Sequence, residues 1–399
     1  MSPSALSSAK DQLPVGVCAP QGFRAAGVAA GIKSSGVKDL ALVVNDGPEF
    51  VAAGVTTSNR VFAAPVAWTR RALTDGQLRA VVLNSGGANA CTGAAGFMDS
   101  KQTADRVAEL LDLPSSDDVA VCSTGLIGVR LPMPQLLGGV AMAVDQLSNK
   151  GGVDAAQAIM TTDTVAKQAS VQLAEGPIIA GMAKGAGMLA PGLATMLVVL
   201  TTDAQLSQDE LSAALQEATR LSFDRIDSDG CMSTNDTVLA MASGASGVKP
   251  DLADFTVGLT RVCWDLARQL IGDAEGAAHD IAIAVVNAAS EADALTVARQ
   301  IGRSNLFKTA IFGNDPNWGR VLSAIGVTDA IFEPDRIDVA FNGVFVCRGG
   351  QIGEDRSRVD LRPRECHVLV DLHAGDAAAT IWTNDLTYDY VRENAEYSS

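Results

Sequence analysis

The chain predicts an α/β protein in which layered sheets are covered by helices, and three observations support this class. Short β-type runs dominate the first third, helical stretches alternate with them, and the last third returns to short strands. The strands and helices lack the regular order of a βαβ protein, which favours stacked sheets over one parallel sheet. The pattern alone does not give the order of the layers.

The first third is expected to be rich in strands, because apolar runs are separated by turns that contain Gly, Asn or Asp. Four such runs are Leu40–Asn45, Val51–Val55, Val61–Trp68 and Ala80–Asn84. A further strand is expected at Val119–Cys122, directly before the turn Ser123-Thr124-Gly125.

Two helices are predicted in the middle of the chain. Ser207 and Glu210 have the spacing of a capping box, and the apolar residues that follow share one helical face. A second apolar stripe begins at Phe255, continues to Leu270 and ends near Asp273. Both stripes predict helices that cover a sheet with one side.

The rest of the chain is expected to contain a strand, a helix and then four short strands. Ile281–Val286 has the pattern of a strand, and Ser290 is placed to cap a helix that runs towards Ile301. Four short strands follow, at Ile337–Phe341, Val344–Cys347, Val368–Leu372 and Ala379–Thr383. The sequence contains no internal repeat and no low-complexity linker.

The composition narrows the possible partners. The 399 residues are 47% hydrophobic and 19% charged, which is typical of a globular chain. A net charge of −16 without any basic run argues against a nucleic-acid partner. The start of the chain lacks the apolar core of a signal peptide, and no apolar run is long enough to cross a membrane. We therefore expect no membrane partner.

The number and spacing of the cysteines and histidines bear on the compartment of the protein and on metal binding. The seven cysteines are scattered and form no Cys-x-x-Cys pair, as is usual for reduced thiols in a cytoplasmic protein. None of the three histidines, His279, His367 and His373, lies near a metal-ligand pattern. We expect a cytoplasmic protein without a metal site, and neither a zinc hydrolase nor a Ser-His-Asp enzyme is favoured.

The segment 184–197, KGAGMLAPGLATML, carries the most chemical information. Its glycine-rich approach leads to Thr195, which opens the apolar run Met196–Leu200, so a loop delivers Thr195 to the start of a buried strand. Cleavage between Ala194 and Thr195 would place a free α-amine beside the Thr195 hydroxyl. A nucleophile and its general base would then belong to one residue. Such an amine has a pKa of about 7.7–8.0 and is partly neutral near physiological pH.

The string KGxGMxxPxxATML resembles the self-cleavage motif of the ornithine acetyltransferase family (ArgJ), without a gap. The resemblance extends from Pro20 to the C-terminal Tyr397-Ser398-Ser399. Further matching segments are NSGGANACTG (84–93), CSTGLIG (122–128), MTTDT (160–164), STNDT (233–237), DAEG (273–276), FGNDPNWGR (312–320) and DLTYDYVRENAEYSS (385–399). Together these segments identify the family much more specifically than any one of them alone.

The resemblance implies an architecture and a processing step. The expected fold is a four-layer α/β/β/α sandwich of the ArgJ/DmpA type with a smaller C-terminal α/β unit. Self-cleavage would give an α chain, residues 1–194, and a β chain, residues 195–399, assembled as α2β2. Residues 195–280 would complete the main sandwich, and residues 281–399 would form the C-terminal unit.

The resemblance also implies the roles of individual residues. Thr195 would be the nucleophile, both for cleavage after Ala194 and for acetyl transfer, with its α-amine as the base. The Thr124 hydroxyl and the Gly125 backbone N–H would form the oxyanion hole. The positions expected to contact substrate are Thr161, Lys184 on the flexible loop, Thr195, Glu275, Asn394 and Ser399. The C-terminal tail would therefore fold back into the site.

The reaction implied by the family is the transfer of acetyl from N2-acetyl-L-ornithine to L-glutamate in arginine biosynthesis, with release of ornithine. It proceeds by ping-pong chemistry through an acetyl-enzyme. Because one amide is exchanged for another, we expect no cofactor, no ATP and no metal. Some members also use acetyl-CoA as a donor to make N-acetylglutamate, and no residue in this chain decides between the two types.

The chain departs from the family pattern beside Glu275. The family usually follows DAEG with a threonine and a basic residue, whereas this chain has Ala277, Ala278, His279 and Asp280. The changed charge next to Glu275 bears on substrate affinity and leaves the nucleophile untouched.

Two other enzyme classes compete with acetyl transfer. A self-cleaving N-terminal-nucleophile aminopeptidase or amidase would share Thr195 and pass the acyl group to water. An NAD-binding oxidoreductase is suggested by Gly185-x-Gly187-x-x-Ala190. However, Pro191 and Gly192 stand where the phosphate-binding helix should continue, and the next element reads as a strand.

A calcium loop at Asp227-Ser228-Asp229-Gly230 is not supported. Aligning Gly230 with the glycine of such a loop places Arg225 in the first ligand position and Asp236 where a bidentate glutamate belongs. We predict a structured turn instead.

Overall fold

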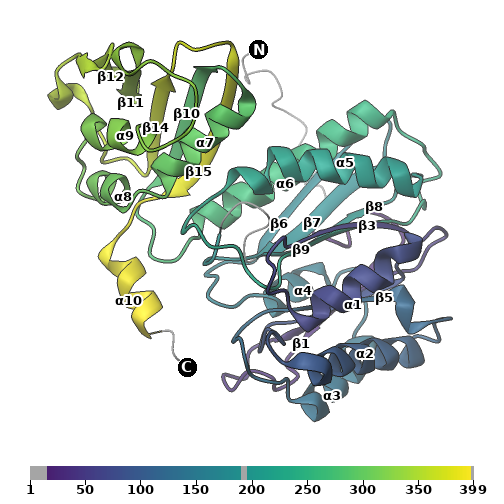
Figure 1. Cartoon of the computed structure of the whole chain (residues 1–399). Helices are drawn as coiled ribbons and strands as arrows, with labels where there is room; N and C mark the ends of the chain where they lie inside the picture. The colour runs from purple at the N-terminus through teal and green to yellow at the C-terminus, as the bar shows by residue number, and fades with distance from the viewer. Residues whose placement is uncertain (1–15, 190–195, 397–399) are drawn as a thin grey trace.

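The computed structural model of the chain describes residues 16–189 and 196–396, which form two α/β units. In Figure 1 the smaller, C-terminal unit stands at the upper left of the larger one. The predicted cleavage residues Ala194 and Thr195 and the C-terminal Ser399 lie outside the described residues. The division into an α and a β chain therefore stays a prediction.

The first sheet of the larger unit mixes antiparallel and parallel pairs. In spatial order its strands are β1 (Phe23–Val28), β2 (Leu40–Asn45), β4 (Ala80–Asn84) and β5 (Val119–Ser123). Only β4 and β5 pair in parallel. Its outer face is covered by α1 (Ala64–Ala72), α2 (Gly93–Leu110) and α3 (Met133–Asp145).

The second sheet contains the strand that follows Thr195 in the sequence. In spatial order its strands are β3 (Val51–Thr56), β9 (Thr237–Ala242), β8 (Leu197–Thr202), β7 (Ile178–Lys184) and β6 (Lys167–Gln172). Its outer face is covered by α5 (Gln208–Leu221) and α6 (Leu252–Gly272), as Figure 1 shows. The capping box predicted at Ser207 and Glu210 starts α5.

The two sheets pack face to face, which fixes the order of the layers. Alternate side chains of β8 point to opposite sides: Val199 packs among residues of the first sheet, whereas Val198 and Leu200 pack beneath the helices. A strand buried on both faces explains the uninterrupted apolar run after Thr195. The short helix α4 (Gly152–Ala158) packs at the edge between the sheets. The predicted α/β/β/α sandwich is confirmed.

The C-terminal unit is built on a six-stranded sheet. Its spatial order is β13 (Gln351–Ile352), β12 (Val344–Arg348), β11 (Asp338–Phe341), β14 (Glu365–Asp371), β10 (Asp280–Ala288) and β15 (Ala377–Asn384). It is accompanied by α7 (Glu291–Gly302), α8 (Asn305–Phe312) and α9 (Trp318–Ile325). Ser290 caps α7 as predicted. The final helix, α10 (Tyr388–Glu396), leaves this unit, as Figure 1 shows.

One predicted strand is wrong. The run Val61–Trp68 was expected to be extended, but most of it belongs to helix α1, which begins at Ala64. Pro65 occupies the first turn of this helix, where its fixed φ and missing N–H favour helix formation. Trp68 is fully buried and its indole N–H donates to the Val119 carbonyl at 2.9 Å. Packing on the first sheet therefore decides the conformation of this run.

Candidate active site

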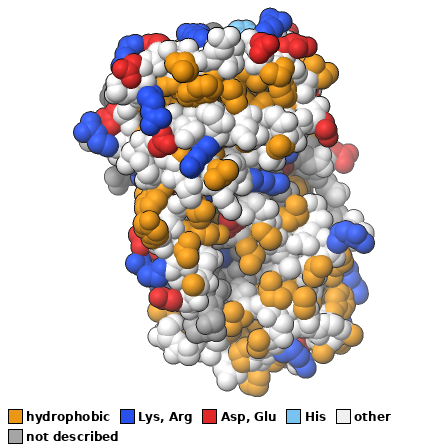
Figure 2. Space-filling model, turned by 60° about the vertical axis from the view of Figure 1, so that its left-hand side comes forward, with side chains coloured by type: hydrophobic (Ala, Val, Ile, Leu, Met, Phe, Trp, Pro, Cys, Tyr) orange, Lys and Arg blue, Asp and Glu red, His pale blue; other side chains and the backbone are white. Residues whose placement is uncertain are grey.

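A cavity of about 420 Å³ lies where α10 returns from the C-terminal unit to the larger unit. All the predicted site residues that the structure describes line it, namely Thr124, Gly125, Thr161, Lys184, Glu275 and Asn394. Figure 2 shows a hollow near the middle of one face of the molecule, where acidic and basic side chains meet apolar ones. The structure thus brings together segments that are far apart in the sequence.

Asn235 ties three of the loops around the cavity to one another. Its buried side-chain amide donates to the Ala88 carbonyl at 2.6 Å and to the Ser123 carbonyl at 2.8 Å. The Ala88 carbonyl belongs to the loop after β4 and the Ser123 carbonyl to the last residue of β5, and all three segments carry the family resemblance. The cavity wall is therefore braced by buried hydrogen bonds, which are costly to break.

Asp236 holds the residue that follows Thr195. Its carboxylate accepts from the Met196 N–H at 3.2 Å and from the Ser233 N–H at 3.0 Å. Burial raises the pKa of Asp236 well above its ordinary value. The Thr237 N–H in turn donates to the Met196 carbonyl at 3.1 Å. The described backbone next to the predicted nucleophile is thus fixed at the edge of the second sheet.

Thr124 and Gly125 present a pair of donors at the cavity wall. The Thr124 oxygen accepts from Lys184 Nζ at 3.1 Å, which leaves its own O–H free to donate elsewhere. The Gly125 N–H has no acceptor among the described residues. Gly125 has a φ of 131°, and a Cβ there would lie 2.7 Å from the Gly87 nitrogen, so only glycine fits. A hydroxyl and a fixed backbone N–H can bind a developing oxyanion.

Lys184 is placed more rigidly than its sequence context suggests. It was expected on a flexible loop, but it is the last residue of β7 and is 1% exposed. Burial lowers the pKa of Lys184, and the carboxylate of Asp163 opposes that shift. Pairing of β7 with β6 and β8 fixes the backbone of this lysine, so its ammonium is held at the cavity wall.

Asp163 was not singled out from the sequence and organises this side of the site. Its carboxylate accepts from Lys167 Nζ at 2.6 Å, from the Gly185 N–H at 2.7 Å and from the Thr161 N–H at 2.9 Å. Burial alone would raise the pKa of Asp163, but the ammonium groups of Lys184 and Lys167 hold it at about 2. In the sequence, only its position in the MTTDT segment (160–164) could have indicated that Asp163 belongs to the site.

Glu275 is held from three directions. Its carboxylate accepts from the Thr162 hydroxyl at 2.8 Å and from Asn394 Nδ2 at 3.0 Å. Its N–H donates to the Ala186 carbonyl at 3.0 Å. Thr162 rather than Thr161 therefore fixes Glu275, whereas the Thr161 hydroxyl lines the cavity with no partner among the described residues. The sequence did not predict that Thr162 binds Glu275 while the adjacent Thr161 faces the cavity.

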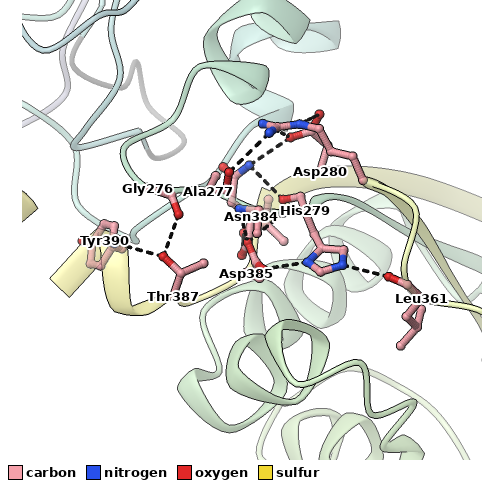
Figure 3. Close-up of polar contacts among 12 residues, drawn as sticks. Gly276, Ala277, His279, Asp280, Leu361, Asn384, Asp385, Thr387 and Tyr390 are labelled. Carbon is pink, nitrogen blue, oxygen red and sulfur yellow. Dashed lines mark hydrogen bonds and ion pairs between the residues drawn. The ribbon is translucent and has the colours of Figure 1, made fainter. Parts of the chain in front are cut away.

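His279 and Asp280, two of the residues that depart from the family pattern, belong to a hydrogen-bonded network with the start of the tail (Figure 3). In the buried His279 ring, Nδ1 lies 2.7 Å from the Asp385 carboxylate and Nε2 lies 2.8 Å from the Leu361 carbonyl. Both ring nitrogens therefore lie within hydrogen-bond distance of an oxygen of the chain. Asp280 is paired with Arg364 at 3.0 Å. Neither the His279 nor the Asp280 side chain lines the cavity, and both have partners within the chain.

The same network anchors the tail helix. Asp385 also accepts from the Ala278 N–H at 3.0 Å and the His279 N–H at 2.9 Å. Thr387 donates to the Gly276 carbonyl at 2.6 Å and accepts from the Tyr390 N–H at 2.9 Å, as Figure 3 shows. The turn after Glu275 and the start of α10 are therefore one hydrogen-bonded unit.

The structure does not support a dinucleotide site. The segment Gly185–Ala190 follows β7, and β7 pairs antiparallel with β8, the next described element. A dinucleotide site needs the N-terminus of a helix at this point. No helix begins in the described part of this connection, up to residue 189 or from residue 196.

The segment 227–230 is a structured turn, as predicted. The Gly230 N–H donates to Asp227 at 3.0 Å, and the other Asp227 oxygen accepts from Arg303 Nε at 2.7 Å. Across residues 16–189 and 196–396, no cluster of three or more His, Cys, Asp or Glu side chains is arranged to hold a metal ion.

Comparison with known proteins relates this chain to one family along most of its length. The sequence pattern of the ArgJ family matches residues 24–399. The arginine biosynthesis bifunctional protein ArgJ of Thermobifida fusca is 63% identical over 383 residues, which cover 96% of this chain and 100% of that protein. The protein of the same name from Streptomyces coelicolor matches with the same identity and coverage.

Among solved structures, the ornithine acetyltransferase from Mycobacterium tuberculosis complexed with ornithine is 58% identical. It covers 46% of this chain and 97% of its own, with a TM-score of 0.44. Within the described ranges, no helix of this chain has the length and apolar character that a membrane span needs.

Proposed function

This chain belongs to the ArgJ family, and on that premise we propose that it is an ornithine acetyltransferase of arginine biosynthesis. It moves the acetyl group of N2-acetyl-L-ornithine to L-glutamate. The observation that supports this best is the cavity in which Thr124, Gly125, Lys184 and Glu275 meet beside the start of β8. A cation, an anion and two oxyanion donors are what an acylated, doubly charged amino acid requires.

Charge determines how the donor substrate lies in this proposal. N2-acetylornithine carries one carboxylate and one side-chain ammonium, and its α-nitrogen is an amide. Glu275 is the carboxylate at the cavity wall that suits the ammonium, and the Lys184 ammonium suits the α-carboxylate. The acetyl carbonyl then lies near the donor pair of Thr124 and Gly125.

The chemistry runs through Thr195 in two half-reactions. The free α-amine of Thr195 takes the proton of its own hydroxyl, and the oxygen attacks the acetyl carbon. The tetrahedral oxyanion is stabilised by the Thr124 hydroxyl and the Gly125 N–H. As the C–N bond breaks, ornithine leaves with the proton and an acetyl ester remains on Thr195. The α-amine of glutamate attacks this ester, and Thr195 regains its proton as N-acetylglutamate is released.

Several properties of the family are part of the same proposal. Cleavage between Ala194 and Thr195 generates the α-amine and divides the chain into residues 1–194 and 195–399, which assemble as α2β2 in the cytoplasm. Acetyl-CoA serves as a second donor to the same Thr195, consistent with the bifunctional name of the relatives. The exchange of one amide for another needs no cofactor.

The decisive experiment compares the intact mass of the purified protein with that of a Thr195→Ala variant under denaturing conditions. We expect two fragments that separate between Ala194 and Thr195, and one uncut chain in the variant. An uncut wild-type chain would refute the N-terminal nucleophile. Acetyl transfer to glutamate, measured with N-acetylornithine and with acetyl-CoA, then separates a transferase from an amidase that releases acetate.

A further inference from the structure

A second cavity of about 300 Å³ adjoins the first one. The two cavities share Asp229, Glu275 and Tyr390 as lining residues. The second cavity lies between the larger unit and the C-terminal unit, because it is lined by Ser228 and Gly230 of the former and by Lys308 of α8 in the latter. None of the roles assigned above uses Lys308 or Arg303.

Lys308 presents an incompletely bonded ammonium to this second cavity. Its side chain is buried, and Nζ donates to the Ser228 carbonyl at 2.6 Å and to the Thr383 hydroxyl at 3.1 Å. An ammonium has three donors, so one N–H has no acceptor among the described residues. Neither of its two hydrogen-bond partners among the described residues is a carboxylate. Burial lowers the pKa of Lys308 to about 8, and Asp227, Asp229 and Asp385 oppose that shift from a distance, so a directly bound anion would stabilise the charged form further.

Arg303 adds a second set of free donors. Its Nε donates to Asp227 at 2.7 Å, whereas its two terminal nitrogens have no hydrogen bond to any described residue. The side chain is 42% exposed and lies against Gly230, which also lines the second cavity. The planar end of a guanidinium matches a carboxylate in two-point geometry.

Two of the carboxylates around this cavity already have donors. Both oxygens of Asp385 are used by the backbone and the ring of His279, and both oxygens of Glu275 are used by Thr162 and Asn394. Asp229 keeps one oxygen without a hydrogen-bond partner, and burial raises its pKa to about 6. Apart from this Asp229 oxygen, the unused hydrogen-bonding capacity of the charged side chains around the second cavity is donor capacity on Lys308 and Arg303, which suits an anion.

The two substrates of the proposed reaction carry opposite charges at the ends of their side chains. N-acetylornithine ends in an ammonium and glutamate ends in a carboxylate, and both must react at one Thr195. Glu275 suits the ammonium, and although it lines both cavities, only the second cavity adds the free donors of Lys308 and Arg303, which suit a carboxylate. We propose that the second cavity is the subsite for the side-chain carboxylate of the acceptor amino acid, bound by Lys308 and Arg303. This inference rests on the proposed acetyl transfer.

Ping-pong chemistry allows a test in which each substrate is measured separately. Labelled ornithine exchanges into N-acetylornithine without glutamate, and labelled glutamate exchanges into N-acetylglutamate without ornithine. In Lys308→Gln, which keeps a donor for Ser228, we expect the KM for glutamate to rise about tenfold or more. The KM for ornithine in its own exchange should change by less than about twofold, because Glu275 is unchanged.

The outcomes separate the subsite from a structural role. An equal loss of both exchanges, or an unchanged KM for glutamate, would overturn the proposal. Arg303→Gln serves as a second variant, because its side chain is half-exposed, and it should show the same selective loss. Arg336→Gln is the matched control, since Arg336 is exposed and lines neither cavity.

Acetyl-CoA provides the last arm of the test. The phosphates of coenzyme A are also anions, so the KM for acetyl-CoA is measured with the same variants. We expect it to be unchanged, and a rise confined to acetyl-CoA would overturn the carboxylate subsite. A wild-type protein that catalyses neither exchange would instead refute the proposed function, which keeps the two failures distinguishable.

Discussion

Asn394 and Glu275 are 119 residues apart in the sequence, yet the side-chain amide of Asn394 donates to the Glu275 carboxylate at 3.0 Å. The bond joins the tail helix α10 to the turn that precedes the C-terminal unit. Since Glu275 also accepts from Thr162, its carboxylate is oriented by two elements before any substrate arrives. A tail that would ordinarily fray is thereby made part of the cavity wall.

Replacing Asn394 with alanine should weaken binding of the donor substrate. A hydrogen bond to a charged group contributes about 1.5–3 kcal/mol, and Asn394 is exposed, so we expect the KM for N-acetylornithine to rise about tenfold. Steady-state kinetics on fully cleaved protein measures this effect. Glu393→Ala changes the adjacent exposed residue and should leave the KM unaltered. A normal KM in Asn394→Ala would mean that the tail bond does not contribute in solution.

The donor pair of the oxyanion hole can be tested without changing the shape of the site. Thr124→Val replaces the hydroxyl with a methyl group, and loss of one such donor lowers kcat by about 10²–10³. We expect the KM for N-acetylornithine to change little, because the donor acts on the tetrahedral oxyanion. Thr124→Ser keeps the hydroxyl and should retain most of kcat. Equal kcat values for the valine and serine variants would exclude Thr124 from the oxyanion hole.

The fold was predictable where a segment has one clear periodicity. The apolar run Met196–Leu200 indicated a fully buried strand, and it forms β8 between the first sheet and the helices. The run Val61–Trp68 was mistaken for a strand, because an apolar segment of this length has no decisive period of its own. Its helical state depends on packing against Val119, which lies more than fifty residues away.

The site was predictable only as far as the family resemblance reached. Asp163 and Thr162 organise Lys184 and Glu275 through hydrogen bonds that cross between strands and loops. Lys308 and Asp229 are brought to one cavity by the packing of the C-terminal unit on the larger one. Such pairings depend on tertiary structure, and the local sequence contains no signal for them. The side chains of His279 and Asp280 follow Glu275 closely in the sequence, but in the fold they pair with Asp385 and Arg364.

His279 should therefore contribute to stability rather than to substrate affinity. His279→Ala leaves the buried carboxylate of Asp385 and the Leu361 carbonyl without their ring partner, which costs about 3 kcal/mol. We expect a clearly lower thermal unfolding midpoint than in wild type at the same heating rate. His367→Ala is the control, because that side chain is exposed on β14. Equal midpoints for the two variants would show that the His279 network is not formed.

The pH dependence of stability in variants of Asp163 and Asp360 tests whether the buried charges around Asp163 stabilise the fold. The pKa of Asp163 is held at about 2 by buried lysines, and the pKa of Asp360 is held at about 2 by Arg362. Asp163 is buried beside Lys184 only in the folded chain, so its pKa is about 4 after unfolding. Arg362 lies two residues from Asp360 and stays nearby in the unfolded chain. Only Asp163 should therefore make folding depend on pH.

The lowered pKa of Asp163 in the folded state determines how the stability of the protein changes with pH. Its stabilisation is fully present above the unfolded pKa of about 4 and is lost as pH falls towards about 2, because the carboxylate must then be protonated. Asp163→Asn should thus destabilise the protein by about 2 kcal/mol at pH 7 and by progressively less as the pH falls below about 4. Asp360→Asn should have the same midpoint as wild type across this range, because solvent screens the exposed pair. Thermal unfolding midpoints across this pH range provide the measurement, and a constant difference between Asp163→Asn and wild type would contradict the lowered pKa.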